Sequence, residues 1–154
     1  MVEERNLYLT QTVARRRPIR SAPLRILARR RVGFLLRLSL AVVFFWFGVL
    51  KLAGVSPVID LLRDAMPILA HSPYIELLGA AEIVIAVGLV IDRLSGYAAA
   101  LMILHLIGTL SLVLISPRLV FEPVFPVLTM QGEFLAKNLV LITAGLTVIS
   151  SRDR

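Results

Sequence analysis

Long apolar runs, each about as long as a bilayer is thick, set the pattern along this chain. Few polar positions interrupt them, and they cover residues 32–53, 74–91, 95–116 and 132–150. A helix of about 20 apolar residues crosses a hydrocarbon core about 30 Å thick. Because the backbone in lipid has to satisfy its own hydrogen bonds, we expect each run to be a transmembrane helix. The predicted fold class is therefore an all-α membrane protein, a bundle of four transmembrane helices.

The connection between the first and second runs contains a shorter helical pattern. Ser56-Pro57 has the form of an N-cap followed by a proline in the first helical turn. The positions that follow separate into an apolar and a charged face. One face carries Val58, Leu61, Leu62 and Ala65, and the other carries Asp60, Arg63 and Asp64. This amphipathic segment predicts a short helix along the outer membrane surface.

Composition agrees with a membrane protein and limits what else the chain can do. Of its 154 residues, 58% are hydrophobic, and the mean hydropathy is +0.85. Apolar residues make up only about 45–50% of a soluble domain. The spans use most of the length, and the absence of cysteine excludes disulfides, a thiolate nucleophile and an iron–sulfur cluster. We therefore expect a lipid bilayer around the protein and no catalysis by this chain alone.

Basic residues are concentrated at the N-terminus. Nine of the 17 Lys and Arg residues lie in residues 1–31, against two acidic residues, and Pro18 and Pro23 interrupt this stretch. We predict a disordered Arg-rich tail over residues 1–31 and a transmembrane domain over residues 32–150. Together with the basic end Arg152-Asp153-Arg154, the tail favours cytoplasmic N- and C-termini. The same charges would bind anionic lipid headgroups, whereas nucleic-acid binding would need interleaved aromatic residues or a known module.

An acidic residue in the middle of the second run is the strongest sign of a site. Glu82 lies among apolar residues, and a carboxylate at mid-membrane is costly unless it faces protein or water. Gly79 and Ala86 share its helix face, which suits close contact between helices. Each of the other runs offers a candidate partner for the carboxylate. These candidates are Lys51, His105 and Lys137.

Depth along each span favours one pairing. At about 1.5 Å per residue from the outer span ends, Glu82 lies roughly 12 Å deep and Lys137 roughly 6 Å, so we predict an ion pair between them. Lys51 lies near its helix end, where it would snorkel outward or join Glu133. His105 is either a hydrogen-bonded packing residue or a metal ligand. No further ligands are visible, so we expect no metal, and haem held by two histidines inside the membrane is excluded. The predicted intramembrane polar site comprises Lys51, Glu82, His105, Thr109, Glu133, Lys137 and Asn138.

Short sequence pieces in chain order carry a resemblance to a known family. They are Phe47-Gly48-x-x-Lys51, Glu82, His105-x-x-Gly108-Thr109 and Gly132-Glu133-Phe134-x-x-Lys137-Asn138-Leu139-x-Leu141. Over residues 33–149 the chain resembles the DoxX-like integral membrane proteins, most closely the branch with the DUF417 (YkgB-type) proteins. The resemblance implies a four-helix protein of the inner (plasma) membrane. Some relatives are described as the small membrane subunit of a thiosulfate:quinone oxidoreductase, and others as membrane partners in oxidative or reactive-chlorine stress defence.

Three functions follow from these observations. The resemblance implies an accessory subunit of a membrane redox or oxidative-stress complex, with a redox partner subunit and a quinone contact through His105, Glu82 and Thr109. It supplies no catalytic residue. The ionisable residues inside the spans also suit a small proton-coupled transporter, which would need to form a homo-oligomer. In the third reading the buried charges only fix helix register in a structural membrane protein without a ligand.

Overall fold

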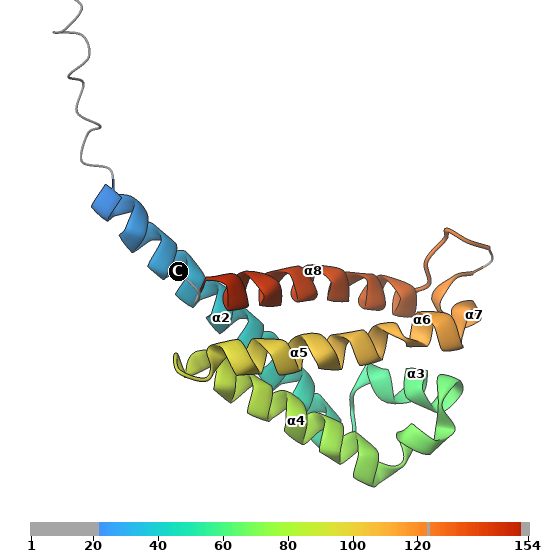
Figure 1. The fold of residues 1–154 in the computed structure, drawn as a ribbon. Coiled ribbons are helices and arrows are strands. Elements are labelled where there is room, and N and C mark those ends of the chain that lie inside the picture. Colours follow the sequence, from blue (N-terminus) through green and yellow to red (C-terminus); the bar gives the residue numbers. More distant parts are fainter. Residues whose placement is uncertain (1–21, 123, 152–154) are drawn as a thin grey trace, which may run out of the picture. The chain divides into compact units, whose positions relative to one another are not determined.

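The structure is a computed structural model that describes residues 22–122 and 124–151. The chain divides into two units, residues 1–32 and 33–154, and the second unit contains the spans apart from residues 30–32. The helices, drawn in Figure 1, are α2 (Ala22–Leu52), α3 (Pro57–Ala65), η1 (Pro67–Ala70), α4 (Ser72–Val90), α5 (Ser95–Leu110), α6 (Leu112–Ile115), α7 (Pro117–Val120) and α8 (Met130–Ser150). Within the described ranges, β pairing is limited to one bridge between Phe121 and Leu128.

Four helical segments in the described part of the chain are long and apolar enough to cross a membrane. They are Arg30–Leu52, Pro73–Val90, Ser95–Ile115 and Met130–Ser150. Each lies within two residues of the predicted boundaries, so the protein is an all-α membrane protein with a four-helix bundle. The third span consists of α5 and α6, which are separated by a turn at Ser111.

The N-terminal tail differs from the prediction where it can be compared. Helix α2 begins at Ala22, so residues 22–31 are helical and not disordered. Continuation of the span explains the difference, because Arg and Leu are good helix formers and no proline follows Pro23 in this stretch. Residues 1–21 and 152–154 lie outside the described residues, and the prediction of disorder for residues 1–21 stays a prediction.

Two glycines let α2 and α4 approach closely. A Cβ atom added at Gly48 would lie 2.7 Å from the carbonyl oxygen of Gly79, and one added at Gly79 would lie 3.0 Å from that of Gly48. The predicted small-residue face of the second span is therefore a contact face. On α2 the same side is buried, with Phe44 2% exposed, whereas Trp46 on the other side is 63% exposed.

Two hydrophobic clusters form the core. Helices α2, α4, α5 and α8 contribute the first, which includes Phe44, Ile85, Leu89, Met102, Leu106 and Val148. Helices α3, α4, α6, α7 and α8 contribute the second, which includes Leu61, Leu62, Ile75, Leu112, Val120 and Leu135. Phe44 and Leu106 of the first cluster line the same cavity as Leu61 and Leu112 of the second. The cavity therefore lies where the two clusters meet.

The predicted short helix between the first two spans is present as α3. Ser56 is its N-cap residue and Pro57 lies in its first turn, as the sequence indicates. Leu61 and Leu62 are buried in the second hydrophobic cluster, while Asp60 and Arg63 form an exposed ion pair. The apolar face of α3 thus packs on the bundle and helps to enclose the cavity.

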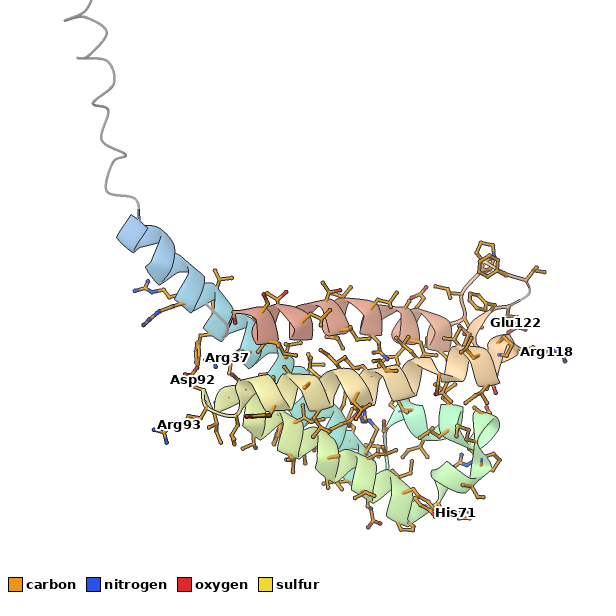
Figure 2. All side chains as sticks on the ribbon, viewed as in Figure 1. Arg37, His71, Asp92, Arg93, Arg118 and Glu122 are labelled. Atoms are coloured by element: carbon orange, nitrogen blue, oxygen red, sulfur yellow. The ribbon has the colours of Figure 1, made fainter. Side chains whose placement is uncertain are left out.

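A polar contact fastens α2 to the turn between α4 and α5. The guanidinium of Arg37 pairs with the carboxylate of Asp92 and donates a hydrogen bond to the hydroxyl of Ser95 at 3.0 Å. Figure 2 shows Arg37 and Asp92 side by side at this turn. Ser95 is fully buried, and its hydroxyl also donates to the backbone carbonyl of Asp92.

The close contact at Gly48 predicts that alanine lowers the free energy of unfolding there but not at Gly108. Gly48→Ala should lower the free energy of unfolding by about 1–3 kcal/mol, because the new methyl group would overlap the backbone of α4. Gly108→Ala should leave it unchanged or raise it by up to about 1 kcal/mol, since nothing lies within 4 Å of that Cβ position. Thermal unfolding in detergent measures both. Equal stabilisation by the two variants would show that α2 and α4 do not meet at Gly48.

Candidate functional site

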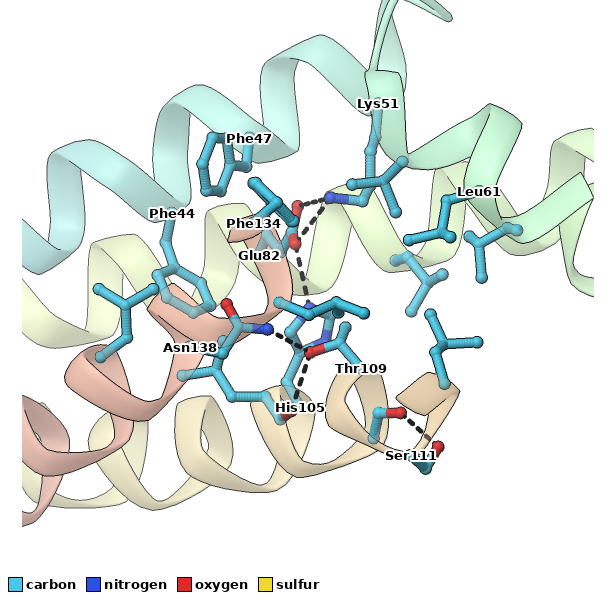
Figure 3. A pocket seen from close by; sticks show the side chains of 18 of the residues that line it. Phe44, Phe47, Lys51, Leu61, Glu82, His105, Thr109, Ser111, Phe134 and Asn138 are labelled. Carbon is cyan, nitrogen blue, oxygen red and sulfur yellow. Dashed lines mark hydrogen bonds and ion pairs between the residues drawn. The ribbon is translucent and has the colours of Figure 1, made fainter. Parts of the chain in front are cut away.

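A buried ion pair forms the centre of the site. The ammonium nitrogen of Lys51 lies 2.8 Å from Oε1 and 2.7 Å from Oε2 of Glu82 (Figure 3). Both side chains are only 5% exposed. Lys51 follows Gly48 by one helical turn, and Glu82 follows Gly79 in the same way. Consecutive spans run in opposite directions, so these two steps lead away from each other along the bundle. A Cβ atom added at Gly79 would lie 3.0 Å from the Cβ of Lys51, so the lysine side chain starts beside Gly79 and extends about one turn along α4 to reach Glu82.

His105 on α5 joins this pair. Its Nε2 atom lies 3.0 Å from Oε1 of Glu82, and its ring packs edge-on against Phe44 with centroids 6.1 Å apart. With an ionised carboxylate, which only accepts hydrogen bonds, this contact needs the proton on Nε2. Glu82 thus contacts polar side chains of both α2 and α5, and three titratable groups are connected inside the spans.

Asn138 and Thr109 make a second polar contact beside the first. The amide nitrogen of Asn138 on α8 donates to the hydroxyl of Thr109 at 2.9 Å, and that hydroxyl donates to the backbone carbonyl of Leu106 at 2.8 Å. Asn138 is 4% exposed, so its side chain faces the bundle, toward Thr109 on the neighbouring helix. The structure therefore brings together five of the predicted residues, Lys51, Glu82, His105, Thr109 and Asn138.

The predicted ion pair between Glu82 and Lys137 is wrong. Lys137 and Glu133 are exposed on α8, and Glu82 pairs with Lys51 instead. The prediction rested on depth along each span and left out the rotation of α8, whose bundle contacts turn Asn138 inward and its neighbour Lys137 outward. Lys51 does not snorkel: its side chain is only 5% exposed and lines the cavity together with residues of α3.

A cavity of about 340 Å³ adjoins these polar groups. Small-molecule sites commonly enclose about 300–1,000 Å³ between mostly apolar walls with a few polar groups. Aromatic rings form part of the walls, with Phe47 and Phe134 packed at 5.6 Å between centroids and Phe47 6.0 Å from the ammonium of Lys51. Residues of α3, including Val58 and Leu61, form another part.

Sequence reasoning missed these aromatic wall residues. A helical signal for them exists, because Phe47 precedes Lys51 by four positions and Phe134 precedes Asn138 by four. Side chains at this spacing share a helix face, so the inward polar residues identify inward aromatic ones. In residues 22–122 and 124–151, no group of three or more His, Cys, Asp or Glu residues is placed to hold a metal ion.

The fold and the site together define a multi-pass membrane protein with a connected set of ionisable side chains buried among its helices. The DoxX family model matches residues 33–115, which is more than half of the chain. The protein therefore belongs to the DoxX family, and the resemblance noted in the sequence is confirmed at that level. No curated protein and no solved structure gives a match. The matched region contains Lys51, Glu82, His105 and Thr109, whereas Asn138 lies beyond it.

Removing the cation of the buried pair should be costly. Lys51→Met leaves the Glu82 carboxylate without its main partner, and the free energy of unfolding should fall by about 3–5 kcal/mol. Adding Glu82→Gln should recover part of this loss, because the uncompensated charge is then absent. Thermal unfolding of both single variants and the double variant in detergent measures the coupling.

The exposed ion pair on α3 supplies the matched control for this experiment. Arg63→Met breaks a pair whose side chains are 63% and 76% exposed, and its cost should stay below about 1 kcal/mol. If the double variant loses as much free energy of unfolding as the Lys51→Met and Glu82→Gln variants lose together, the two side chains are not coupled.

Proposed function

We propose that this protein is an accessory membrane subunit of a redox or oxidative-stress complex, and that its cavity binds a quinone headgroup. The observation that carries the proposal is the cavity of about 340 Å³ with apolar and aromatic walls and hydrogen-bond donors on one side. A quinone ring is flat and apolar, and its two carbonyl oxygens accept hydrogen bonds. The cavity therefore offers complementary groups for both parts of such a ligand.

Donor capacity at the site supports this assignment. A lysine ammonium has three N–H donors, and Lys51 directs two contacts to Glu82. The amide of Asn138 has two N–H donors and gives one to Thr109. One donor on each side chain is therefore left for a ligand, from α2 and α8 respectively. Phe47 and Phe134 would pack against the quinone ring.

The accessory role rests on what this chain contains. It has no cysteine, and the spans with their connections use most of its 154 residues. In the proposed complex the redox centre that exchanges electrons with the quinone is carried by a partner subunit. The cavity residues of this chain would bind and orient the quinone and keep water from it.

We place the protein in the DUF417 (YkgB-type) branch of the family as part of this proposal. Support comes from the stretch Gly132 to Leu141, which lies outside the matched residues 33–115. Two residues of this stretch, Phe134 and Asn138, line the cavity. This stretch would then contribute directly to the ligand site.

We further propose that both termini are cytoplasmic and that the membrane is the inner (plasma) membrane. The positive charge of the N-terminal tail supports this orientation, and the same charges would contact anionic headgroups. Reporter fusions at each end test it: both should give a cytoplasmic signal. An extracytoplasmic signal from either terminus would contradict the proposed orientation.

A short-chain, water-soluble benzoquinone should stabilise the purified protein. Binding to the folded state raises the free energy of unfolding with concentration, by about 2.7 kcal/mol at 100 times the dissociation constant. Asn138→Leu should reduce this effect, because it removes a donor while the Thr109 hydroxyl keeps its bond to Leu106. Thermal unfolding in detergent over a range of quinone concentrations is the measurement.

The control for this experiment is a second amide on the same helix. Gln131→Leu, at the exposed start of α8, should leave the quinone effect unchanged.

Affinity purification from native membranes should also recover a redox partner. A protein that purifies alone and shows no quinone effect would overturn the proposal and favour a structural role for the buried charges.

One observation favours a second candidate, a proton-coupled transporter. Lys51, Glu82 and His105 form a connected chain of titratable groups inside the spans, as a proton path requires. This function would be identified by solute-driven proton uptake into sealed vesicles that is lost in Glu82→Gln. Quinone would then have no effect on the stability of the protein.

A further inference from the structure

Helix α8 has an outward face unlike those of its neighbours. The exposed faces of α4 and α5 are mainly apolar, with Leu77, Val84, Leu101 and Leu104 among their exposed residues, and the exposed acid of α4, Glu76, lies near the start of that helix. On α8 the side opposite Leu135 and Asn138 is small and polar. Its exposed residues are Glu133, Ala136, Lys137, Val140, Thr143 and Thr147, which we call the α8 stripe. At 100° per residue they fall within one sector of the helix.

The α8 stripe is poorly suited to lipid. Lys137 follows Met130 by seven positions, so its Cα lies about 10 Å along the helix from that end. Neither Lys137 nor Glu133 takes part in an ion pair within the described residues. Charged side chains within membrane spans usually face a protein interior and pair there. A protein surface over the stripe would satisfy both charges.

The stripe is complementary to itself in charge and in shape. It carries one acid and one base, one helical turn apart, and its other residues are small or β-branched. The hydroxyls of Thr143 and Thr147 already donate to carbonyls one turn earlier, so they leave a smooth surface without unmet donors. Small residues of this kind permit close approach of transmembrane helices.

We propose that a second copy of this chain covers the α8 stripe, so that the protein is a symmetric homodimer in the membrane. In a two-fold interface, a contact between one residue of the first copy and another residue of the second copy occurs again with the two copies exchanged. With the axis along the membrane normal the two α8 helices run parallel. Glu133 of one copy then reaches Lys137 of the other, and the same contact occurs twice. The proposal does not depend on the ligand of the cavity.

Disulfide cross-linking tests the dimer directly, because the chain has no cysteine of its own. Val140→Cys places one thiol in the centre of the stripe, at a position 69% exposed in the single chain. Leu104→Cys places one on the outward face of α5, at a position 65% exposed, and serves as the matched control. Oxidation in native membranes should give a severalfold larger dimer fraction for Val140→Cys than for Leu104→Cys.

Charge reversal then tests the contact between copies. In the Val140→Cys protein, Lys137→Glu puts only acids on the stripe and should lower the dimer fraction severalfold. Adding Glu133→Lys restores one charge of each sign and should restore cross-linking. Because the double variant must fold to cross-link, its recovery also excludes misfolding as the cause of the first loss.

Three outcomes would overturn the proposal. The first is equal cross-linking of the two cysteine variants, and the second is no recovery in the double charge reversal. The third is a cross-linked product of Val140→Cys with the mass of this chain plus a different protein, which would assign the stripe to a heterologous subunit.

Discussion

A lysine and a glutamate that meet inside the membrane spans are the constraint on which the rest of the bundle depends. Lys51 and Glu82 can pair only if α2 and α4 adopt one height and one rotation, and the Gly48–Gly79 contact provides both. His105 then sets the rotation of α5 through the same carboxylate. Apolar residues could hold such helices together at least as well as a buried ion pair does. The pair therefore acts through the one helix register that it permits and not through added stability.

The fold could be predicted from the sequence because it depends mainly on properties that can be read along the chain. A span needs length and hydropathy, and a short amphipathic helix needs spacing, so all the spans and α3 were predicted. The partner of Glu82 was not, because pairing also needs the rotation of each helix. Lys51 shares a helix face with Phe44 and Gly48, which the structure buries. A lysine near a helix end is nevertheless expected to snorkel, because the tertiary packing that buries it is not visible in the sequence.

Helix α8 connects the two proposals made for this protein. Its inward side contributes Phe134 and Asn138 to the cavity, and its outward side carries Glu133 and Lys137. The family match covers residues 33–115 and ends before this helix. The buried triad of Lys51, Glu82 and His105 lies within the matched residues. The part of the chain that matches the family thus contains the buried ionisable side chains. Helix α8 adds one wall of the cavity and the α8 stripe.

The contact of Arg37 with Asp92 and Ser95 gives the bundle a mechanical asymmetry. Directional polar bonds clamp α2 to the turn between α4 and α5 at that end. At the other end α3 meets the bundle through apolar side chains, which can slide against one another without breaking a bond of fixed geometry. The two ends of the bundle are therefore held by different kinds of contact: one fixes an orientation, and the other fixes only how much apolar surface is buried.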